Sequence, residues 1–550
     1  MEATPTLTAG GTRHMGARPR LFDFNQERDR IIRDATERVF QIHVARAEAN
    51  PSQGLEYLLN EAAFRELERL TRFGPDDEIG EVGSFGFWRG LARRVGSAGE
   101  GEKRRVLKRL VRSYLTDIAG NFDPRVYQFA NQVLPVGLSL LFNAQGGGVP
   151  GSRFRRLRDR IQIEGDLDTL RALAQRGTMI VAPTHLSNLD SPVIGWALKE
   201  AGLPPVTYGA GKNLFTNRLL SYFMHNLGAY RVDRRISHGI YKSCLKAYSE
   251  VLLERGFRSL FFPGGTRSRS GEVERHLKLG LLGTGLTAYA RGLEAGRPDK
   301  KLFVVPMTLN CSLVLEAEGL INDYLRAVGR EDFLLPNDPF DSPAEVARFV
   351  TKIATMQTSM VIRLGEPMDI LGHRVDAEGV SYDGQGRPVR LETFFEGPDG
   401  SYGLSPERDR IYTRQTGEAL VEAYVRETVI LPTQFLAYVL FEAARRHFPE
   451  LDLVRVLRFG QDLHIPWDEV NAEAGRLQAI LREAVRAGRI RALASVLEKS
   501  VPELIDEALV GLNVYHAKAP VEATGQGIRL GNMELLCYYG NRLRALEELA

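Results

Sequence analysis

Apolar residues recur three and four positions apart through the first quarter of the chain, from residue 21 to about residue 143. Between residues 58 and 70, leucine, alanine and phenylalanine return at this spacing. Such a period places the apolar side chains on one face of each helix. The pattern predicts a helical N-terminal domain over residues 21–150. The polar residues 1–20 before it are expected to form a disordered leader.

The pattern changes after a glycine-rich breaker at residues 146–151. Short runs rich in β-branched and aromatic residues then alternate with helical stretches; they cover residues 178–182, 206–208, 229–232, 259–262, 302–305 and 360–364. Such alternation is typical of an α/β fold. We therefore expect a mixed, largely parallel central sheet flanked by helices over residues 151–405. Helical periodicity returns in residues 406–550, which are expected to form a helical C-terminal region.

Composition excludes several classes of protein. The 550 residues are 43% hydrophobic and 26% charged, which excludes a disordered or fibrous chain. Lys and Arg number 72 against 69 Asp and Glu, and the resulting net charge of +3 argues against an evenly basic nucleic-acid binder. The widely separated Cys244, Cys311 and Cys537 exclude a disulfide framework and a zinc site built from cysteine pairs. They favour a reducing compartment.

The apolar runs are too short to predict a membrane-spanning helix. The best candidate covers residues 133–142, whereas a spanning helix needs about 20 apolar residues, so we expect a buried helix or a surface-inserting segment there. Two basic runs follow a different pattern. Residues 102–112 place Arg104, Arg105, Lys108, Arg109 and Arg112 on one helical face, and residues 153–160 are also basic. Such a face either lies on an anionic membrane or is a solvated charged surface. Because the apolar runs are too short to span a bilayer, we expect a soluble or peripheral protein.

Candidate chemistry begins where the strand predicted at residues 178–182 ends. His185 and Asp190 are five residues apart, about 140° around a continuous helix. They can meet only if the chain bends, as it does at a strand–turn–helix junction; Ser191 and Pro192 suit the cap and first position of that helix. A carboxylate on one imidazole nitrogen leaves the other free to remove a proton from a hydroxyl. Taken alone, this pair is also consistent with a histidine that caps a turn.

Two further strand ends carry arginines. The strand at residues 259–262 runs into a glycine-rich turn with Arg267 and Arg269, and the strand at residues 229–232 is followed by Arg234. Glycines let backbone N–H groups approach an anion, and arginines donate pairs of hydrogen bonds to phosphate. Ligands usually bind at the carboxyl edge of such a sheet. We therefore expect the base, its carboxylate and the arginines at one edge, although each arginine singly is consistent with a surface position.

The order of these blocks resembles that in the glycerolipid acyltransferases, closest to the glycerol-3-phosphate and dihydroxyacetone-phosphate acyltransferase group. The segment from His185 to Asp190 is similar to the family's His-x4-Asp block, and residues 228–234, 262–269 and 305–309 are similar to its second, third and fourth blocks. Further likeness lies at residues 210–215, 364–367 and 535–543. The resemblance runs from about residue 160 to the end of the chain.

The resemblance implies an O-acyltransferase of phospholipid biosynthesis that moves a fatty acyl group to the sn-1 hydroxyl of glycerol 3-phosphate. The donor would be acyl-CoA or acyl carrier protein, and the enzyme would lie at the cytoplasmic face of the membrane as a peripheral protein. His185 would be the general base, oriented by Asp190. The substrate-binding residues would be Arg234, Gly265, Thr266, Arg267, Ser268, Arg269 and Lys278, with Pro306 shaping the acyl or acceptor pocket. No metal or tightly held cofactor is implied.

Two departures from the family pattern leave alternatives open. Gly264 stands where the third block usually carries glutamate, so a carboxylate expected near the glycerol hydroxyls or the phosphate is missing. The second block reads Val232-Asp233-Arg234, which is closer to the lysophosphatidate acyltransferases. The alternatives are an acyltransferase for 1-acylglycerol 3-phosphate or dihydroxyacetone phosphate, and a catalytically weak lipid- or acyl-binding homologue. A thioester hydrolase is less consistent, since no Gly-x-Ser-x-Gly elbow precedes a helix.

Overall fold

The computed structural model describes residues 20–75, 82–132, 160–215, 218–329, 360–514, 516 and 518–547. Residues 1–19 of the expected leader, the apolar run at 133–142 and the glycine-rich breaker at 146–151 lie outside the described residues. All but the last residue of the basic run at 153–160 also lies outside them.

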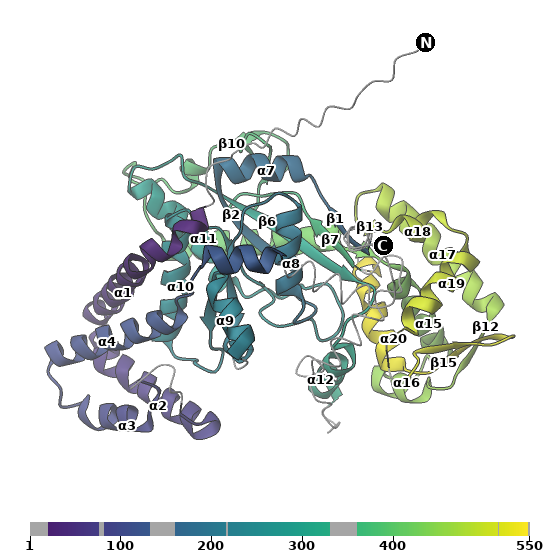
Figure 1. The fold of residues 1–550 in the computed structure, drawn as a ribbon, viewed down its shortest axis with the longest axis horizontal. Helices are drawn as coiled ribbons and strands as arrows, with labels where there is room; N and C mark the ends of the chain where they lie inside the picture. Colours follow the sequence, from purple (N-terminus) through teal and green to yellow (C-terminus); the bar gives the residue numbers. More distant parts are fainter. Residues whose placement is uncertain are drawn as a thin grey trace, which may run out of the picture.

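A seven-stranded mixed sheet forms the centre of the molecule, in the order β1-β7-β6-β2-β5-β3-β4 (Figure 1). Its strands are β1 (Ile161–Glu164), β2 (Gly177–Pro183), β3 (Thr207–Gly211), β4 (Ala229–Val232), β5 (Ser259–Leu260), β6 (Lys301–Cys311) and β7 (Met360–Leu364). The block from β6 to β4 is parallel; β7 runs antiparallel to β6, and β1 parallel to β7. The expected mixed, largely parallel sheet is confirmed. Each strand predicted from the sequence contributes to it, whereas β1 was not expected.

The pairing of β2 with β6 forms the middle of the sheet. Ile180 lies opposite Val304, and Ala182 lies opposite Pro306. Helices join the parallel strands and cover both faces, which is why these strands read as nearly continuous apolar runs. The joining helices are α8 (Asp190–Glu200), α9 (Arg218–Asn226), α10 (Gly239–Glu254) and α11 (Leu279–Glu294), and α7 (Leu167–Arg176) leads from β1 into β2.

The N-terminal helices pack beside β4 and α10 (Figure 1). They are α1 (Phe24–Ala49), α2 (Leu55–Phe73), α3 (Phe85–Arg94) and α4 (Glu100–Ile118). Their apolar faces share one buried cluster with α10; it includes Trp88, and Tyr114 contacts Tyr241 within it. These helices bury their stripes against the α/β unit, consistent with the helical spacing of their apolar residues.

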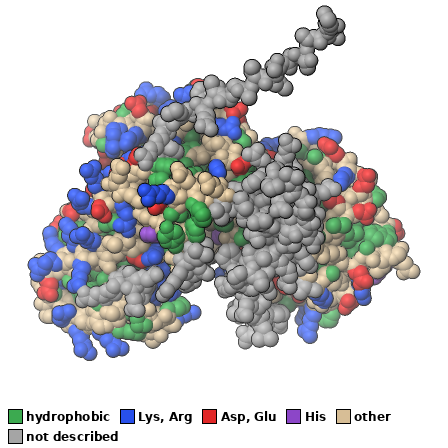
Figure 2. All heavy atoms as spheres, in the orientation of Figure 1, with side chains coloured by type: hydrophobic (Ala, Val, Ile, Leu, Met, Phe, Trp, Pro, Cys, Tyr) green, Lys and Arg blue, Asp and Glu red, His purple; other side chains and the backbone are tan. Residues whose placement is uncertain are grey.

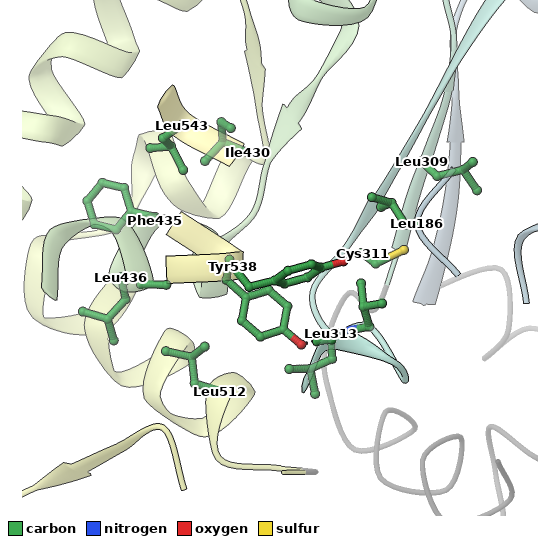
Figure 3. Close-up of a cluster of buried hydrophobic side chains, with 14 of the residues drawn as sticks. Leu186, Leu309, Cys311, Leu313, Ile430, Phe435, Leu436, Leu512, Tyr538 and Leu543 are labelled. Carbon is green, nitrogen blue, oxygen red and sulfur yellow. Dashed lines mark hydrogen bonds between the residues drawn. The ribbon is translucent and has the colours of Figure 1, made fainter. Parts of the chain in front are cut away.

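The C-terminal segment packs at the opposite end of the sheet (Figure 1). Its longer helices are α14 (Pro406–Glu427), α15 (Pro432–His447), α16 (Leu453–Phe459), α17 (Trp467–Arg486), α19 (Val501–Leu512) and α20 (Met533–Gly540). One buried cluster unites all of these helices except α14 with the sheet, and Figure 3 shows Leu186 and Cys311 facing Tyr538 within it. Helix α14 belongs to a second buried cluster, which it shares with α11. Between β7 and α14, the short strands β8 (Arg374–Val375), β9 (Ser381–Tyr382) and β10 (Pro388–Val389) form a separate small sheet.

Basic side chains of α4 lie on the surface but several pair with neighbouring helices. Arg104 contacts Glu48 at 2.7 Å, and Lys108 contacts Glu37 at 2.8 Å. Lysine and arginine side chains are conspicuous over this end of the molecule in Figure 2. Among the helices of the described ranges, none is both long and apolar enough to cross a bilayer.

Candidate active site

The turn between β2 and α8 brings His185 and Asp190 together. His185 Nδ1 lies 2.8 Å from Asp190 Oδ2. The same oxygen accepts the N–H groups of Leu186 and Ser187 at 2.6 and 2.9 Å, so the carboxylate holds the bend in the chain. The expected helix start, with Ser191 as cap and Pro192 first, is wrong, because α8 begins at Asp190. A proline fits within the first turn because the first N–H groups of a helix have no intrahelical acceptor.

His185 is held on its ring and on its main chain. Its imidazole stacks on Phe262 with centroids 4.1 Å apart, and its carbonyl accepts the Ser268 N–H at 2.7 Å. The side chain is 14% exposed, whereas that of Asp190 is completely buried. Within the described part of the chain, Nε2 has no hydrogen-bond partner. With Nδ1 donating to Asp190, this second nitrogen is suited to accept a proton.

Glu316 ties this turn to Arg267, and sequence reasoning missed it. Its carboxylate accepts the Ser187 hydroxyl at 2.7 Å, the Asn188 N–H at 2.9 Å and Arg267 Nη1 at 3.0 Å. Burial raises the pKa of Glu316, and the Asn188, Ser187 and Arg267 donors oppose that rise. Glu316 follows the end of β6, so its position after a predicted parallel strand was the available signal.

Two of the predicted phosphate ligands, Arg234 and Arg267, come together although they follow different strands. Burial lowers the pKa of Arg234, and the positive charge of Arg267 lowers it further. Two cations at one edge of the sheet, of which Arg267 is also paired with Glu316, favour binding of a phosphate. Arg269 lies exposed on the same loop as Arg267.

The glycine-rich turn after β5 places the remaining predicted ligands. Gly265 has φ +75°, a conformation that favours glycine, and the stem of Lys278 lies against it. Ser268 donates its hydroxyl to the Glu272 carbonyl at 3.0 Å, and Thr266 is partly exposed. Pro306 is buried in β6 opposite Ala182, within the sheet.

A carboxylate does lie beside Gly264, because Glu274 supplies one from ten residues further along the chain. Its Oε1 accepts the His185 N–H at 2.6 Å. A Cβ on Gly264 would collide with Glu274 Oε2, so the carboxylate fills the space that a side chain at 264 would need. Burial raises the pKa of Glu274 to about 7, against the lowering effects of the His185 N–H and Arg542.

The C-terminal segment contacts the end of β6 and the loop after β5 through Arg542, which is almost completely buried. Its guanidinium donates to the carbonyls of Leu309 at 3.0 Å and Glu272 at 3.4 Å. Asn541 adds a hydrogen bond to the Ser270 carbonyl at 2.8 Å. The likeness at residues 535–543 drew attention to this segment, but sequence reasoning did not place it against the site.

An apolar cavity of about 370 Å³ opens beside the turn that carries Asp190. Asn188, Ser191 and Pro192 line one part of it. The other lining residues include Ile194, Gly195 and Leu198 of α8, Tyr208 of β3, Phe223 and Met224 of α9, and Phe129. Such a cavity can hold an apolar chain, and its lining reaches the turn between His185 and Asp190 at Asn188. Pro306 is not among its lining residues in the described structure.

Residues 164–309 match the family described as Acyltransferase, and this range contains all four sequence blocks. The chain is similar to the glycerol-3-phosphate acyltransferase of Pseudomonas paraeruginosa, with 24% identity over 352 residues, 62% of this chain and 36% of that protein. The corresponding enzyme of Aeromonas hydrophila is 26% identical over 226 residues, 41% of this chain and 25% of that protein. The chain thus spans about one third of the length of the first of these relatives.

A probable mitochondrial glycerol-3-phosphate acyltransferase of Caenorhabditis elegans is 28% identical over 172 residues, 30% of this chain and 23% of that protein. These matches confirm the resemblance to the glycerolipid acyltransferases. Among solved structures, the 1-acyl-sn-glycerophosphate acyltransferase of Thermotoga maritima aligns over 67% of this chain and 96% of that chain, with 13% identity. Its TM-score of 0.24 is too low to establish a shared overall fold.

Proposed function

We propose, from the match of residues 164–309 to the Acyltransferase family, that the chain transfers a fatty acyl group from a thioester to the sn-1 hydroxyl of glycerol 3-phosphate. The observation that carries the proposal is the His185–Asp190 pair at the same sheet edge as Arg234 and Arg267. A base beside an anion site is what transfer to a phosphorylated alcohol needs. The names of the curated relatives support this acceptor.

The reaction assigns one proton-transfer role to His185. Its Nε2 takes the proton of the acceptor hydroxyl while the oxygen attacks the thioester carbonyl. Asp190 stabilises the resulting imidazolium through Nδ1–H. The attack forms the new C–O ester bond, and the C–S bond then breaks. The leaving thiolate accepts the proton from the His185 imidazolium and departs as a thiol.

The arginines bind the acceptor phosphate in this proposal. Arg234 and Arg267 supply two guanidinium groups, and the exposed Arg269 and Lys278 add positive charge around them. The glycine-rich turn at Gly265, Thr266 and Ser268 provides the wall against which the phosphate lies. The ion pair of Arg267 with Glu316 keeps the guanidinium in one orientation before the acceptor binds.

The apolar cavity holds the acyl chain. Its lining includes Asn188 and Ser191, on either side of Asp190 in the chain, and Leu198 further along α8. Each methylene buried there contributes about 0.8 kcal/mol to donor binding. The donor is acyl-CoA or acyl carrier protein, since both present the same thioester.

Attachment to an anionic membrane surface is part of the proposal, because both the donor's acyl chain and the product are lipids. The exposed cations of α4, including Arg105 and Arg112, are the surface that would contact the bilayer as a peripheral protein at its cytoplasmic face.

A direct assay tests the function. Purified protein is supplied with labelled acyl-CoA or acyl carrier protein and with glycerol 3-phosphate, lysophosphatidate or dihydroxyacetone phosphate. We expect transfer to glycerol 3-phosphate, loss of turnover in His185→Ala, and normal turnover in His447→Ala, whose histidine lies on α15. Turnover that survives in His185→Ala contradicts the mechanism. Faster transfer to lysophosphatidate or dihydroxyacetone phosphate shows that glycerol 3-phosphate is not the preferred acceptor. Binding of the donor without transfer to any acceptor indicates a binding protein.

A further inference from the structure

The loop that carries Glu274 folds back onto the end of β5. The Lys278 N–H donates to the Pro263 carbonyl at 2.7 Å, which joins the two ends of the loop. Within it, the Ser268 hydroxyl bonds to the Glu272 carbonyl at 3.0 Å. Glu274 is therefore returned to the strand end from which the glycine-rich turn departs, although it lies ten residues beyond Gly264.

Glu274 and Ser268 hold the main chain of His185 from its two sides. Glu274 Oε1 accepts the His185 N–H at 2.6 Å, and the Ser268 N–H donates to the His185 carbonyl at 2.7 Å. A hydrogen bond from a peptide N–H to a carboxylate is among the stronger ones in proteins. Because the imidazole extends from this main chain, its direction toward a bound hydroxyl depends on both contacts.

The Glu274 carboxylate occupies the space into which a side chain at position 264 would extend. Gly264 does not have the left-handed conformation that its neighbour Gly265 has, so its backbone admits a side chain. Such a side chain would displace Glu274 Oε2, which a Cβ at 264 would meet. This oxygen is buried and has no hydrogen-bond partner among the described residues. The carboxylate therefore fills the space beside His185 that residue 264 leaves empty.

We propose that Glu274 is a positioning residue for His185, contributed by the returning loop in place of a side chain at position 264. The proposal rests on the acyl transfer proposed above. A side chain at position 264 and the Glu274 carboxylate use the same space, so the proposal can be tested by supplying the carboxylate from position 264 instead. Asp190 and Arg542 are the charged groups that act on it, the first raising and the second lowering its pKa.

Four variants test the proposal: Glu274→Ala, Glu274→Gln, Gly264→Glu, and the double variant Gly264→Glu/Glu274→Ala. We expect Glu274→Ala to lose about 100-fold in kcat, because small misplacement of a reacting group costs that much. Glu274→Gln keeps an acceptor for the His185 N–H and most of the activity. Gly264→Glu alone loses activity because two carboxylates compete for one space.

The double variant decides the matter, since it returns a carboxylate from the other position. We expect it to recover about tenfold or more over Glu274→Ala, a non-additive result typical of interacting sites. Thermal unfolding of each variant shows that it is folded. Glu294→Ala, at the exposed end of α11, serves as a glutamate control with normal kcat. A double variant that is folded but no better than Glu274→Ala overturns the proposal, as does normal kcat in Glu274→Ala.

A second measurement separates this proposal from the proposed function. If the unaltered protein transfers no acyl group to any acceptor, the function fails, and the variants are compared by the rate at which diethyl pyrocarbonate modifies His185. Peptide mass spectrometry resolves this histidine from the others. We expect a rate change of several-fold in Glu274→Ala and its reversal in the double variant. Equal rates in the unaltered protein and the variants overturn the positioning role.

Discussion

Asp190 Oδ2 accepts three hydrogen bonds at once, one of them from His185 Nδ1 at 2.8 Å. The carboxylate is completely buried at the first position of α8, whereas the imidazole is partly exposed. One oxygen therefore bends the chain and orients the ring. The Asp190 side chain therefore both stabilises the bend between residues 185 and 190 and forms the hydrogen bond to His185.

Replacing Asp190 by asparagine should impair catalysis more than folding. Asparagine fills the same volume but donates a hydrogen bond toward Nδ1, which leaves the wrong tautomer at Nε2. We expect kcat to fall by roughly 10³- to 10⁴-fold, as in other carboxylate–histidine pairs that act on a hydroxyl. The matched control is Asp369→Asn, because Asp369 holds His373 Nδ1 at 3.0 Å outside the proposed site. Similar losses in both variants would indicate a structural role.

Arg267→Ala should affect binding of the acceptor but not binding of the donor. Loss of one guanidinium from the pair with Arg234 should raise the KM for glycerol 3-phosphate by about tenfold or more and leave the KM for the acyl thioester unchanged. Arg455→Ala on α16, an exposed arginine remote from the turn, is the control. An increase confined to the thioester KM shows that the phosphate lies elsewhere.

Gly195→Leu should shorten the preferred acyl chain. Gly195 lines the apolar cavity, and a Cβ there would meet no atom within 4 Å, so the new side chain enters the cavity without a clash. Each methylene of the donor that no longer fits loses about 0.8 kcal/mol of binding. Competition between thioesters of different length measures the shift. Gly475→Leu on α17, equally free of contacts, should leave the preference unchanged; an unchanged preference in Gly195→Leu places the chain elsewhere.

Stability should depend on pH through Glu274. Burial raises its pKa from 4.5 to about 7, so the folded chain holds this proton more tightly than the unfolded chain. The free energy of unfolding therefore falls as pH rises from about 4.5 to 7. Glu274→Gln lacks this titration and should gain up to about 3 kcal/mol relative to the unaltered protein between pH 4.5 and 8. Urea unfolding at both pH values measures the difference, and Glu294→Gln should show none.

Charge reversal on α4 tests membrane attachment. Arg105→Glu/Arg112→Glu changes two exposed side chains and should weaken binding to vesicles that contain anionic lipid, because each cation near such a surface contributes about 1 kcal/mol. Flotation with the vesicles measures the bound fraction. Arg455→Glu/Arg458→Glu on α16 makes the same change in net charge elsewhere. Unchanged flotation of the α4 variant, or equal loss in both, contradicts contact through this helix.

Local pattern was sufficient to predict the strands and their class of sheet. The runs at 229–232 and 360–364 coincide with β4 and β7, because a buried strand needs a short apolar, β-branched stretch whatever its neighbours. β1 was missed because it is short and its central residues are only partly buried, so its composition is less distinctive. The start of α8 was missed by two residues because Asp190 serves the preceding turn.

The sequence by itself determined which side chains follow parallel strands. Strand direction then requires His185, Arg234 and Arg267 to share one edge of the sheet, and their approach follows from that geometry. Only the tertiary structure decided that Glu274, Glu316 and Arg542 join them. Their contacts depend on a loop that returns to its own start and on a C-terminal segment packed against the sheet. Such long-range contacts leave no periodicity in the chain, because they are selected by the total packing of the folded protein rather than by local spacing.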